Sequence, residues 1–330
     1  MSQMGELGRV MVLAGGLSHE RDVSLRSGRR VAEALREAGV EVEQRDADAD
    51  LLAELRADPP SVVLPVLHGS SGEDGSIREL LELVGVPYVG SRPGPSRLAW
   101  DKPTAKTLAR RAGLDSPEEV VLPEETFRDL GAADLLEAVR ARLGLPLVVK
   151  PARGGSALGC SVVHTAEQLP AAMVGCFAYG DLALLERHVS GVEVAVTVLD
   201  TGDGPWALPA VEIVPDGGVY DYACRYTAGM TEFFVPARLD TDLAARVGSA
   251  AVTVHRELGL RDLSRTDAII TPEGSVQFLE VNVAPGLTET SLLPQALEAA
   301  GLDAGAVFAD LLRLALQRAA TEYRPDSVSL

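Results

Sequence analysis

Hydrophobic positions in the first hundred residues alternate between two patterns, that of a buried strand and that of an amphipathic helix. The run RVMVLAGG, residues 9–16, is rich in branched apolar side chains and ends in two glycines. Residues 24–38 then repeat apolar side chains at helical spacing. This succession of strand and helix recurs, which is typical of a parallel sheet with crossover helices. The remaining elements expected in this α/β region are strands at 40–46 and 61–69 and a helix at 76–85.

Beyond the Gly/Pro/Ser cluster GSRPGPSR, residues 90–97, the pattern changes. One helix is predicted at 96–112, followed by a connector and then by a hairpin at 145–164 whose strands flank a glycine-rich loop. The segment 216–235 has no clean period and is rich in Gly and Tyr, so we expect a mobile loop that acts as a lid. The other expected elements are two strands within 182–200, strands at 208–214, 263–270 and 275–283, a helix at 166–175, and helices at 241–258 and 304–319 that cover the last sheet.

Composition places this chain of 330 residues among ordinary globular proteins, with 46% hydrophobic and 24% charged residues. The formal net charge of −18 argues against nucleic acid or an anionic membrane as the main partner. No apolar run reaches the length of a membrane span, and the N-terminus lacks the features of a signal peptide. The three cysteines have no metal-ligand spacing, which favours reduced thiols in the cytoplasm.

Lysine is rare in this chain, since Lys102, Lys106 and Lys150 are its only lysines and the other 27 of 30 basic residues are arginines (30 − 3 = 27). A lysine retained against this bias suggests a place where a compact point charge is wanted, as at a phosphate.

Two polar residues interrupt the apolar strand VQFLEVNV near the C-terminus. Glu280 and Asn282 are two residues apart and therefore share one strand face, whereas Leu279 and Val281 are expected to face the opposite layer. If this strand pairs with the preceding one through the turn TPEGS, Asp267 joins them in a cluster of oxygen ligands that suits Mg²⁺. A hydrogen-bonded polar pair at a strand end is the alternative.

Three other motifs suggest ligand contacts. The segment KPARGGSALG, residues 150–159, places a lysine before small residues whose backbone N–H groups could cradle phosphate, although a plain hairpin loop is equally compatible. Glu186 and Glu193 could accept hydrogen bonds from an adenine amine and from ribose hydroxyls. Solvated side chains are the alternative. Glu20 follows the first strand at the sheet edge where open α/β sheets bind ligands, and His68 and Glu73 follow a later strand and could orient one another.

Eight motifs in order resemble the D-alanine–D-alanine ligase family of the ATP-grasp superfamily, over residues 10–316. They read HERDVSL, HGSSGEDG, DKPTAK, KPARGGSALG, LLERHVSGVEVAV, YDYACRY, SRTDAII and LEVNVAPGLTETSLLP. The resemblance implies an N-terminal α/β substrate domain (1–100), a central ATP-grasp subdomain (101–188) and a C-terminal ATP-grasp subdomain (189–330). It also implies ATP with two metal ions, Mg²⁺ or Mn²⁺, as cofactors, D-alanine as the substrate, and a homodimer.

Carried over position by position, the resemblance gives each candidate residue a role. Lys102, Lys150 and Arg225 would bind ATP phosphates, Glu186 and Val189 the adenine, and Glu193 the ribose. Asp267, Glu280 and Asn282 would be the metal ligands. Glu20, linked to Ser156 and Tyr226, would hold the first substrate's ammonium, and Arg265 and the Gly286 backbone would stabilise the oxyanion. Ser291 would bind the second substrate's carboxylate, and His68 and Leu292 are further expected substrate contacts.

Four positions depart from the family pattern, namely Arg225 for lysine, Ala157 for serine, and the apolar Val283 and Leu287. They leave open a paralogue of the same chemistry that uses another second amino acid. A nucleotide-binding regulatory protein without catalysis is a further alternative, against which the intact metal, lysine and arginine positions count. A dinucleotide-dependent oxidoreductase is excluded, because no G-x-G-x-x-G follows the first strand.

Overall fold

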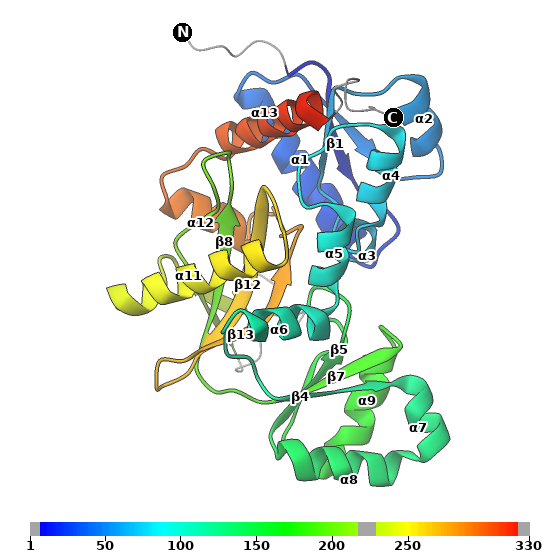
Figure 1. Cartoon of the computed structure of the whole chain (residues 1–330), viewed down its shortest axis with the longest axis vertical. Coiled ribbons are helices and arrows are strands. Elements are labelled where there is room, and N and C mark those ends of the chain that lie inside the picture. The colour runs from blue at the N-terminus through cyan, green and yellow to red at the C-terminus, as the bar shows by residue number, and fades with distance from the viewer. Residues whose placement is uncertain (1–6, 217–228, 323–330) are drawn as a thin grey trace, which may run out of the picture.

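The computed structural model of the chain describes residues 7–216 and 229–322. Within these residues, three sheets follow one another along the long axis of the molecule (Figure 1). The sheet at one end is parallel and the other two are antiparallel, which confirms the mixed α/β class expected from the sequence.

The parallel sheet has the order β2-β1-β3, with β1 completely buried. Successive residues of a strand face opposite layers, so Val10 and Val12 pack against the core that holds α1 and α13. Met11 and Leu13 instead pack into the core that holds α2 and α4. The bounds are β1 Val10–Ala14, β2 Val42–Asp46, β3 Val62–Pro65, α1 Arg21–Glu37, α2 Leu51–Ala57, α3 Ser70–Glu73 and α4 Ser76–Val84.

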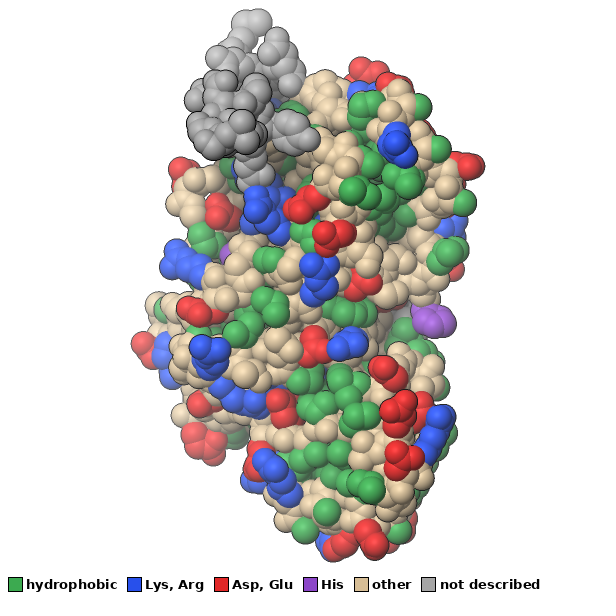
Figure 2. Space-filling model, turned by 45° about the vertical axis from the view of Figure 1, so that its right-hand side comes forward, with side chains coloured by type: hydrophobic (Ala, Val, Ile, Leu, Met, Phe, Trp, Pro, Cys, Tyr) green, Lys and Arg blue, Asp and Glu red, His purple; other side chains and the backbone are tan. Residues whose placement is uncertain are grey.

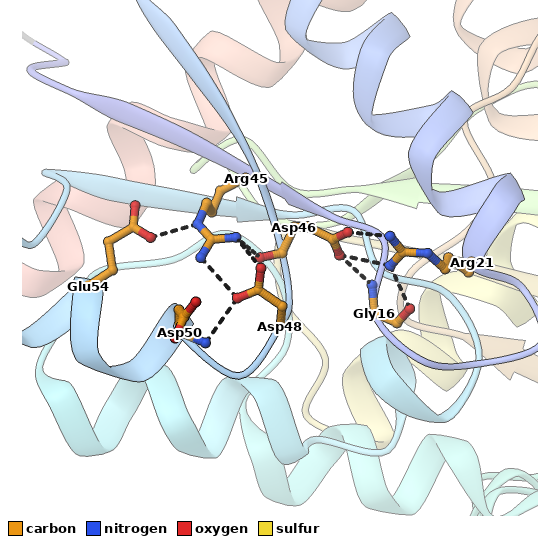
Figure 3. Close-up of polar contacts among 7 residues, drawn as sticks. All are labelled: Gly16, Arg21, Arg45, Asp46, Asp48, Asp50 and Glu54. Carbon is orange, nitrogen blue, oxygen red and sulfur yellow. Dashed lines mark hydrogen bonds and ion pairs between the residues drawn. The ribbon is translucent and has the colours of Figure 1, made fainter.

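The loop between β1 and α1 is fixed by the side chain of Asp46 at the end of β2 (Figure 3). Asp46 Oδ1 accepts from the Gly16 N–H at 3.0 Å and from Arg21 Nη1 at 2.9 Å. The Arg21 hydrogen bond lowers the pKa of Asp46, although partial burial acts in the opposite direction. Because Arg21 opens α1, this contact sets where the preceding residue, Glu20, lies.

The four-stranded sheet has the order β4-β7-β5-β6. The predicted hairpin is confirmed, since β5 and β6 pair antiparallel on either side of the glycine-rich loop. The expectation of a simple connector between the helix at 96–112 and this hairpin was wrong, because residues 119–143 form one strand and two helices. The bounds are β4 Glu119–Pro123, α7 Glu124–Leu130, α8 Ala132–Leu143, β5 Leu147–Pro151, β6 Ser161–Val163, a 3₁₀ turn Ala166–Gln168, α9 Leu169–Phe177 and β7 Leu182–Arg187.

The single helix predicted at 96–112 was also wrong. The chain forms α5, Pro93–Trp100, and then α6, Lys102–Arg111, with extended backbone at Asp101 between them. The Asp101 side chain accepts from the Thr104 N–H at 3.1 Å and so caps α6, whose second residue is Pro103. The capping acid and the proline both favour a new helix start over a continuous helix.

The third sheet runs β11-β10-β8-β12-β13, with β9 paired to β8. Helix α11 covers one face, where Val247 and Ala251 pack against alternate residues of β8. Residues 231–234 form β11, so the end of the segment expected to be a mobile loop is a strand instead; 217–228 lie outside the described residues. The bounds are β8 Val192–Leu199, β9 Trp206–Ala207, β10 Val211–Pro215, β11 Thr231–Phe234, α11 Thr241–Glu257, β12 Leu263–Ile270, β13 Val276–Asn282 and α12 Leu292–Ala299.

The last helix, α13 (Ala304–Glu322), does not cover the last sheet as predicted. It packs on α1, beside which Figure 1 draws it, and on β3 of the parallel sheet. Phe308, Leu311 and Leu312 are buried there in a core that includes Val31 and Leu35 of α1. The helical period predicted that α13 has an apolar face but not which sheet this face covers, because an apolar face packs equally well on either sheet.

On the face drawn in Figure 2, acidic and basic side chains are interspersed with apolar ones. Within residues 7–216 and 229–322, no helix combines the length and the hydropathy needed to cross a membrane.

Candidate active site

A cavity of about 360 Å³ lies between the four-stranded sheet and the third sheet. The four-stranded sheet and the glycine-rich loop contribute one wall, and β8, β12 and β13 contribute the other. Polar groups in this lining include those predicted for ATP and metal, together with Arg187, His188 and Ser190, and Ile269, Leu279 and Val148 add apolar surface. The predicted residues that line this cavity are Lys102, Lys150, Glu186, Val189, Glu193, Asp267 and Glu280.

The predicted pairing of the last two strands is confirmed, with Asp267 opposite Glu280 and Arg265 opposite Asn282. A β-bulge interrupts the register, because Ala268 pairs with Phe278 and leaves Leu279 as the extra residue. Leu279 therefore lines the cavity instead of facing the opposite layer. The prediction for Leu279 was wrong because strict alternation fails at a bulge.

The glycine-rich loop is anchored to the start of α6. Lys102 donates from its backbone N–H to Ala152 O at 3.0 Å and from Nζ to Gly154 O at 2.7 Å. Further along the loop, Ser156 and Ala157 both have φ near +54°, a left-handed conformation that costs energy outside glycine. This turn directs the Ser156 hydroxyl toward the N-terminal region of the chain.

A second, smaller cavity of about 50 Å³ adjoins this loop. It brings together residues from the parallel sheet, the glycine-rich loop and the third sheet that are far apart in sequence. The predicted residues lining it are Glu20, His68, Ser156, Arg265, Asn282, Gly286, Ser291 and Leu292. Arg225 and Tyr226, for which the sequence also predicts roles here, lie outside the described residues.

Glu20 is buried and accepts a hydrogen bond from the Ser156 hydroxyl, which confirms their predicted link. Two glycines leave room for this carboxylate. A Cβ at Gly69, where φ is +67°, would overlap Glu20 Oε2, and one at Gly155 would lie 3.0 Å from Oε1. The parallel sheet and the glycine-rich loop thus approach one another closely at Glu20.

His68 does not orient Glu73 as the sequence suggested. Its Nδ1 lies 2.9 Å from Ala284 O and its Nε2 lies 3.0 Å from Ser27 Oγ. A carbonyl only accepts, so Nδ1 carries the proton, and burial lowers the pKa of His68 to about 4, which leaves the ring neutral. The Ser27 hydroxyl therefore donates to Nε2, and its oxygen accepts from the Leu287 N–H at 3.2 Å. His68 and Ser27 therefore hold the 284–287 loop against the N-terminal region.

Ser291 closes the smaller cavity at the start of α12. Its Oγ accepts from the Thr288 N–H at 2.9 Å, and a Cβ at Gly286 would lie 2.7 Å from this oxygen. Only glycine at 286 allows so close an approach. A helix N-terminus with a hydroxyl beside it attracts a carboxylate, because its first N–H groups have no partner within the helix.

Known proteins match this chain over most of its length. Family models described as the N-terminus and the C-terminus of D-ala D-ala ligase match residues 40–91 and 108–313. A D-alanine–D-alanine ligase from Anaeromyxobacter dehalogenans is 43% identical over 94% of this chain and 97% of its own. The chain belongs to the D-alanine–D-alanine ligase family.

Solved structures resemble the chain over almost its whole length. A D-alanine–D-alanine ligase from Bacillus anthracis complexed with ATP has a TM-score of 0.77 and 26% identity, covering 95% of this chain and 99% of that one. The VanG D-Ala:D-Ser ligase from Enterococcus faecalis has a TM-score of 0.78 and 28% identity, covering 93% and 99%. This member of the ligase family is accordingly an ATP-dependent ligase.

Two of the four departures from the family pattern lie in the core. Val283 is 2% exposed and packs with Phe278 and Val281, and Leu287 is 9% exposed and packs with Leu292 and Leu293. Neither side chain lines the smaller cavity, so their apolar character serves packing.

The candidate metal ligands already have partners within the protein. Arg265 donates to both oxygens of Asp267, from Nε at 2.7 Å and from Nη2 at 2.8 Å, and Lys102 Nζ lies 3.6 Å from Glu280 Oε2. Asn282 Oδ1 accepts from the Ala284 N–H at 2.7 Å. Two opposed carboxylates with an amide oxygen beside them have the donor chemistry that Mg²⁺ takes. In the described part of the chain, no three His, Cys, Asp or Glu side chains could hold a metal together, so the set depends on Asn282.

Sequence reasoning gave no role to Ser27, Lys106 or Glu119. Ser27 lies on the buried face of α1, where a serine looks like an ordinary small core residue. Lys106 carried one usable signal, because it is one of only three lysines in the chain.

The pH dependence of the free energy of unfolding tests whether buried Glu73 is protonated in the folded state. Burial first, and then the charge of Glu20, raise the pKa of Glu73 to about 8. The unfolded state releases this proton near pH 4.5 and the folded state near pH 8, so stability falls as pH rises between them. The substitution Glu73→Gln keeps the acceptor for the Gly69 N–H. Urea melts at several pH values are expected to show it gaining up to roughly 4 kcal/mol over wild type from pH 5 to 8, since this range lies between the two pKa values and each pH unit carries about 1.4 kcal/mol.

The matched control is Glu33→Gln, which changes an exposed carboxylate on α1. It is expected to keep the wild-type pH dependence. A Glu73→Gln profile parallel to that of wild type would show that Glu73 is ionised in the folded state.

Proposed function

We propose that this protein joins two D-alanine molecules into D-alanyl-D-alanine, through an acylphosphate and with release of ADP and phosphate, for peptidoglycan precursor synthesis. Membership of the ligase family supports this, together with a nucleotide-sized cavity beside a smaller polar one.

One strand pair carries the proposal, because β12 and β13 line both cavities. Asp267 and Glu280 line the larger cavity, and Arg265 and Asn282, which are next on the same strand face, line the smaller one. Residues i and i+2 of a strand are about 7 Å apart. A phosphate bound at the first pair would therefore lie within reach of a carboxylate bound at the second.

ATP would occupy the larger cavity. Lys102, Lys150 and the N–H groups of the glycine-rich loop would bind its phosphates, with Arg225 at the same end. Glu186 and the Val189 backbone would bind the adenine, and Glu193 the ribose. The Bacillus anthracis ligase, which has the same fold and was solved in complex with ATP, supports ATP as the nucleotide.

Asp267, Glu280 and Asn282 would hold Mg²⁺ or Mn²⁺, with two ions at this site. The metal would offset phosphate charge during transfer. Arg265 contributes fixed positive charge at the same place, and its two hydrogen bonds to Asp267 keep the guanidinium oriented.

The two amino acids would bind in the smaller cavity. Glu20 would accept the first ammonium, assisted by Ser156 and Tyr226. Arg265 and the Gly286 N–H would stabilise the oxyanion formed when the second amine attacks the acyl carbon. Ser291 and the start of α12 would take the second carboxylate, next to His68 and Leu292.

The larger-scale organisation is proposed from the family. The chain would divide into an N-terminal substrate domain (1–100), a central ATP-grasp subdomain (101–188) and a C-terminal ATP-grasp subdomain (189–330). We propose that it acts in the cytoplasm, where ATP is supplied, and as a homodimer.

Phosphate release from ATP tests the function directly. With D-alanine as the only amino acid, turnover is expected to be saturable and the product to be the dipeptide. Turnover with D-serine or another acceptor beside D-alanine, but not with D-alanine alone, would assign the chain to a paralogue like the D-Ala:D-Ser ligase. Stabilisation by ATP without turnover on any acceptor would favour a regulatory nucleotide-binding protein.

A further inference from the structure

Lys106 is a charged side chain with no exposed surface. It lies on α6, and its ammonium contacts Glu186 and lies 2.6 Å from Glu119 Oε2. Burying an ammonium is costly unless partners compensate it. It does not line the larger cavity, whereas Glu186 does, so Lys106 contacts this carboxylate from behind.

The strand register explains why a cation is needed there. Glu119 of β4 and Glu186 of β7 are directly opposite one another in an antiparallel pair, and like charges in that position repel. Lys106 bridges the two carboxylates. Arg110 binds the far side of Glu119 at 3.0 Å, and Lys150 binds Glu186 at 2.8 Å. Glu186 is therefore held by two ammonium groups that come from different elements.

Helix α6 connects the two ends of the larger cavity. Lys102 and Lys106 are four residues apart and share one helix face, about 6 Å apart along the axis. Lys102 donates to Gly154 O at the phosphate end, and Lys106 contacts Glu186 at the other end. Asp101 caps the helix and binds Arg153 of the glycine-rich loop at 2.9 Å, which fixes the helix along its axis.

We propose that Lys106 is a positioning residue that holds Glu186 as an acceptor-only carboxylate aimed into the cavity, and that this selects adenine over guanine nucleotides. The proposal rests on the assignment of the larger cavity to ATP. An ionised carboxylate accepts hydrogen bonds and donates none. Adenine presents an amino group on its six-membered ring where guanine presents a carbonyl oxygen, which would face the carboxylate with no proton between them.

The charges around Glu186 agree with an ionised carboxylate. Burial by itself would raise the pKa of Glu186, but Lys150 and Lys106 outweigh it and lower the pKa. Without Lys106, Glu186 would face Glu119 across the strands with Lys150 as its remaining cation, which would favour protonation. A protonated Glu186 could donate to a carbonyl oxygen, so the preference for adenine would weaken.

The test replaces Lys106 with methionine, which keeps the length of the side chain and removes its charge. Thermal shifts with ATP and with GTP measure nucleotide binding without turnover, and initial rates give kcat and KM for each. The affinity for ATP is expected to fall about 10-fold with kcat changed less than about threefold, and the ATP-to-GTP preference to fall at least about 10-fold. An unchanged preference would overturn the proposal, because a purely structural role weakens both nucleotides equally.

Two further variants keep the test decisive. In Lys106→Met/Glu119→Gln a neutral amide replaces the opposed carboxylate, so Glu186 no longer faces a like charge across the strands. Much of the ATP preference is therefore expected to return. A double variant that folds and keeps the relaxed preference of Lys106→Met would contradict the charge argument. Arg111→Met removes an exposed charge from the same helix and is expected to behave as wild type.

The same measurements separate this inference from the proposed function. A wild-type protein that ATP does not stabilise at all would refute the placement of ATP. A wild-type protein that prefers ATP, together with a Lys106→Met variant that keeps the same preference, would refute only the role of Lys106.

Discussion

Replacing Glu280 with alanine is expected to lower turnover by at least about 10³-fold while the fold is retained, because a metal ligand contributes several kcal/mol to transition-state stabilisation. Glu280 lies opposite Asp267, and its removal would leave one carboxylate and one amide at the proposed metal site. Its side chain is 23% exposed and its lysine neighbour keeps Gly154 O as a partner, so little stability is lost. The measurement is phosphate release under saturating substrates, with thermal unfolding as the check on the fold.

The matched control is Glu273→Ala, in the exposed turn that joins the same two strands. It removes an equal charge from the turn beyond the Ile270–Val276 pair, at the end of the strand pair away from Asp267 and Glu280, and is expected to leave kcat unchanged. Activity like that of wild type in Glu280→Ala, in the presence of Mg²⁺, would remove Glu280 from the metal site.

The substitution Arg265→Lys is expected to lower kcat by about 10² to 10³-fold, the effect of losing one oxyanion donor. Arginine donates through two nitrogens in a fixed plane, which a lysine ammonium does not reproduce. The positive charge beside Asp267 remains, so the buried carboxylate keeps a partner and the fold is expected to persist. Separate measurement of kcat and of KM for ATP tests this, because the loss is expected in kcat.

Arg238→Lys is the control for Arg265→Lys. Arg238, in the loop after β11, binds Glu212 of β10 through the same two-point geometry, from Nε at 3.0 Å and from Nη2 at 2.6 Å, and both residues lie outside the two cavities. It is expected to change stability only slightly and turnover not at all. Equal losses of kcat in both variants would mean that Arg265 acts through the sheet rather than on the substrate.

Local patterns predicted the parts of the fold that depend on neighbouring residues. The strands of the parallel sheet, the glycine-loop hairpin and the pairing of the last two strands were all predicted correctly. The break at Asp101 was missed, although Pro103 and a capping acid were visible, because the apolar spacing continued across it. The error at Leu279 has the same origin, since periodicity does not report a bulge.

Local sequence patterns did not predict which residues form the smaller cavity. Glu20, Ser156 and Arg265 come from three different parts of the chain, and the family resemblance, not the spacing, grouped them. Their hydrogen-bond partners could not be predicted from either. The expected pairing of His68 with Glu73 gave way to contacts with Ser27 and Ala284, which lie 41 and 216 residues away in sequence.

By itself the sequence determined the fold class, the ligase family and most candidate site residues, because each depends on period, spacing or an ordered set of motifs. The tertiary structure decided which side chains share a cavity, which of them are held by residues outside that cavity, and where α13 packs. These properties depend on contacts between distant segments, and many partners satisfy the same local pattern. Lys106 shows the difference: its rarity is visible in the sequence, but only the opposed carboxylates of β4 and β7 give a reason for its burial.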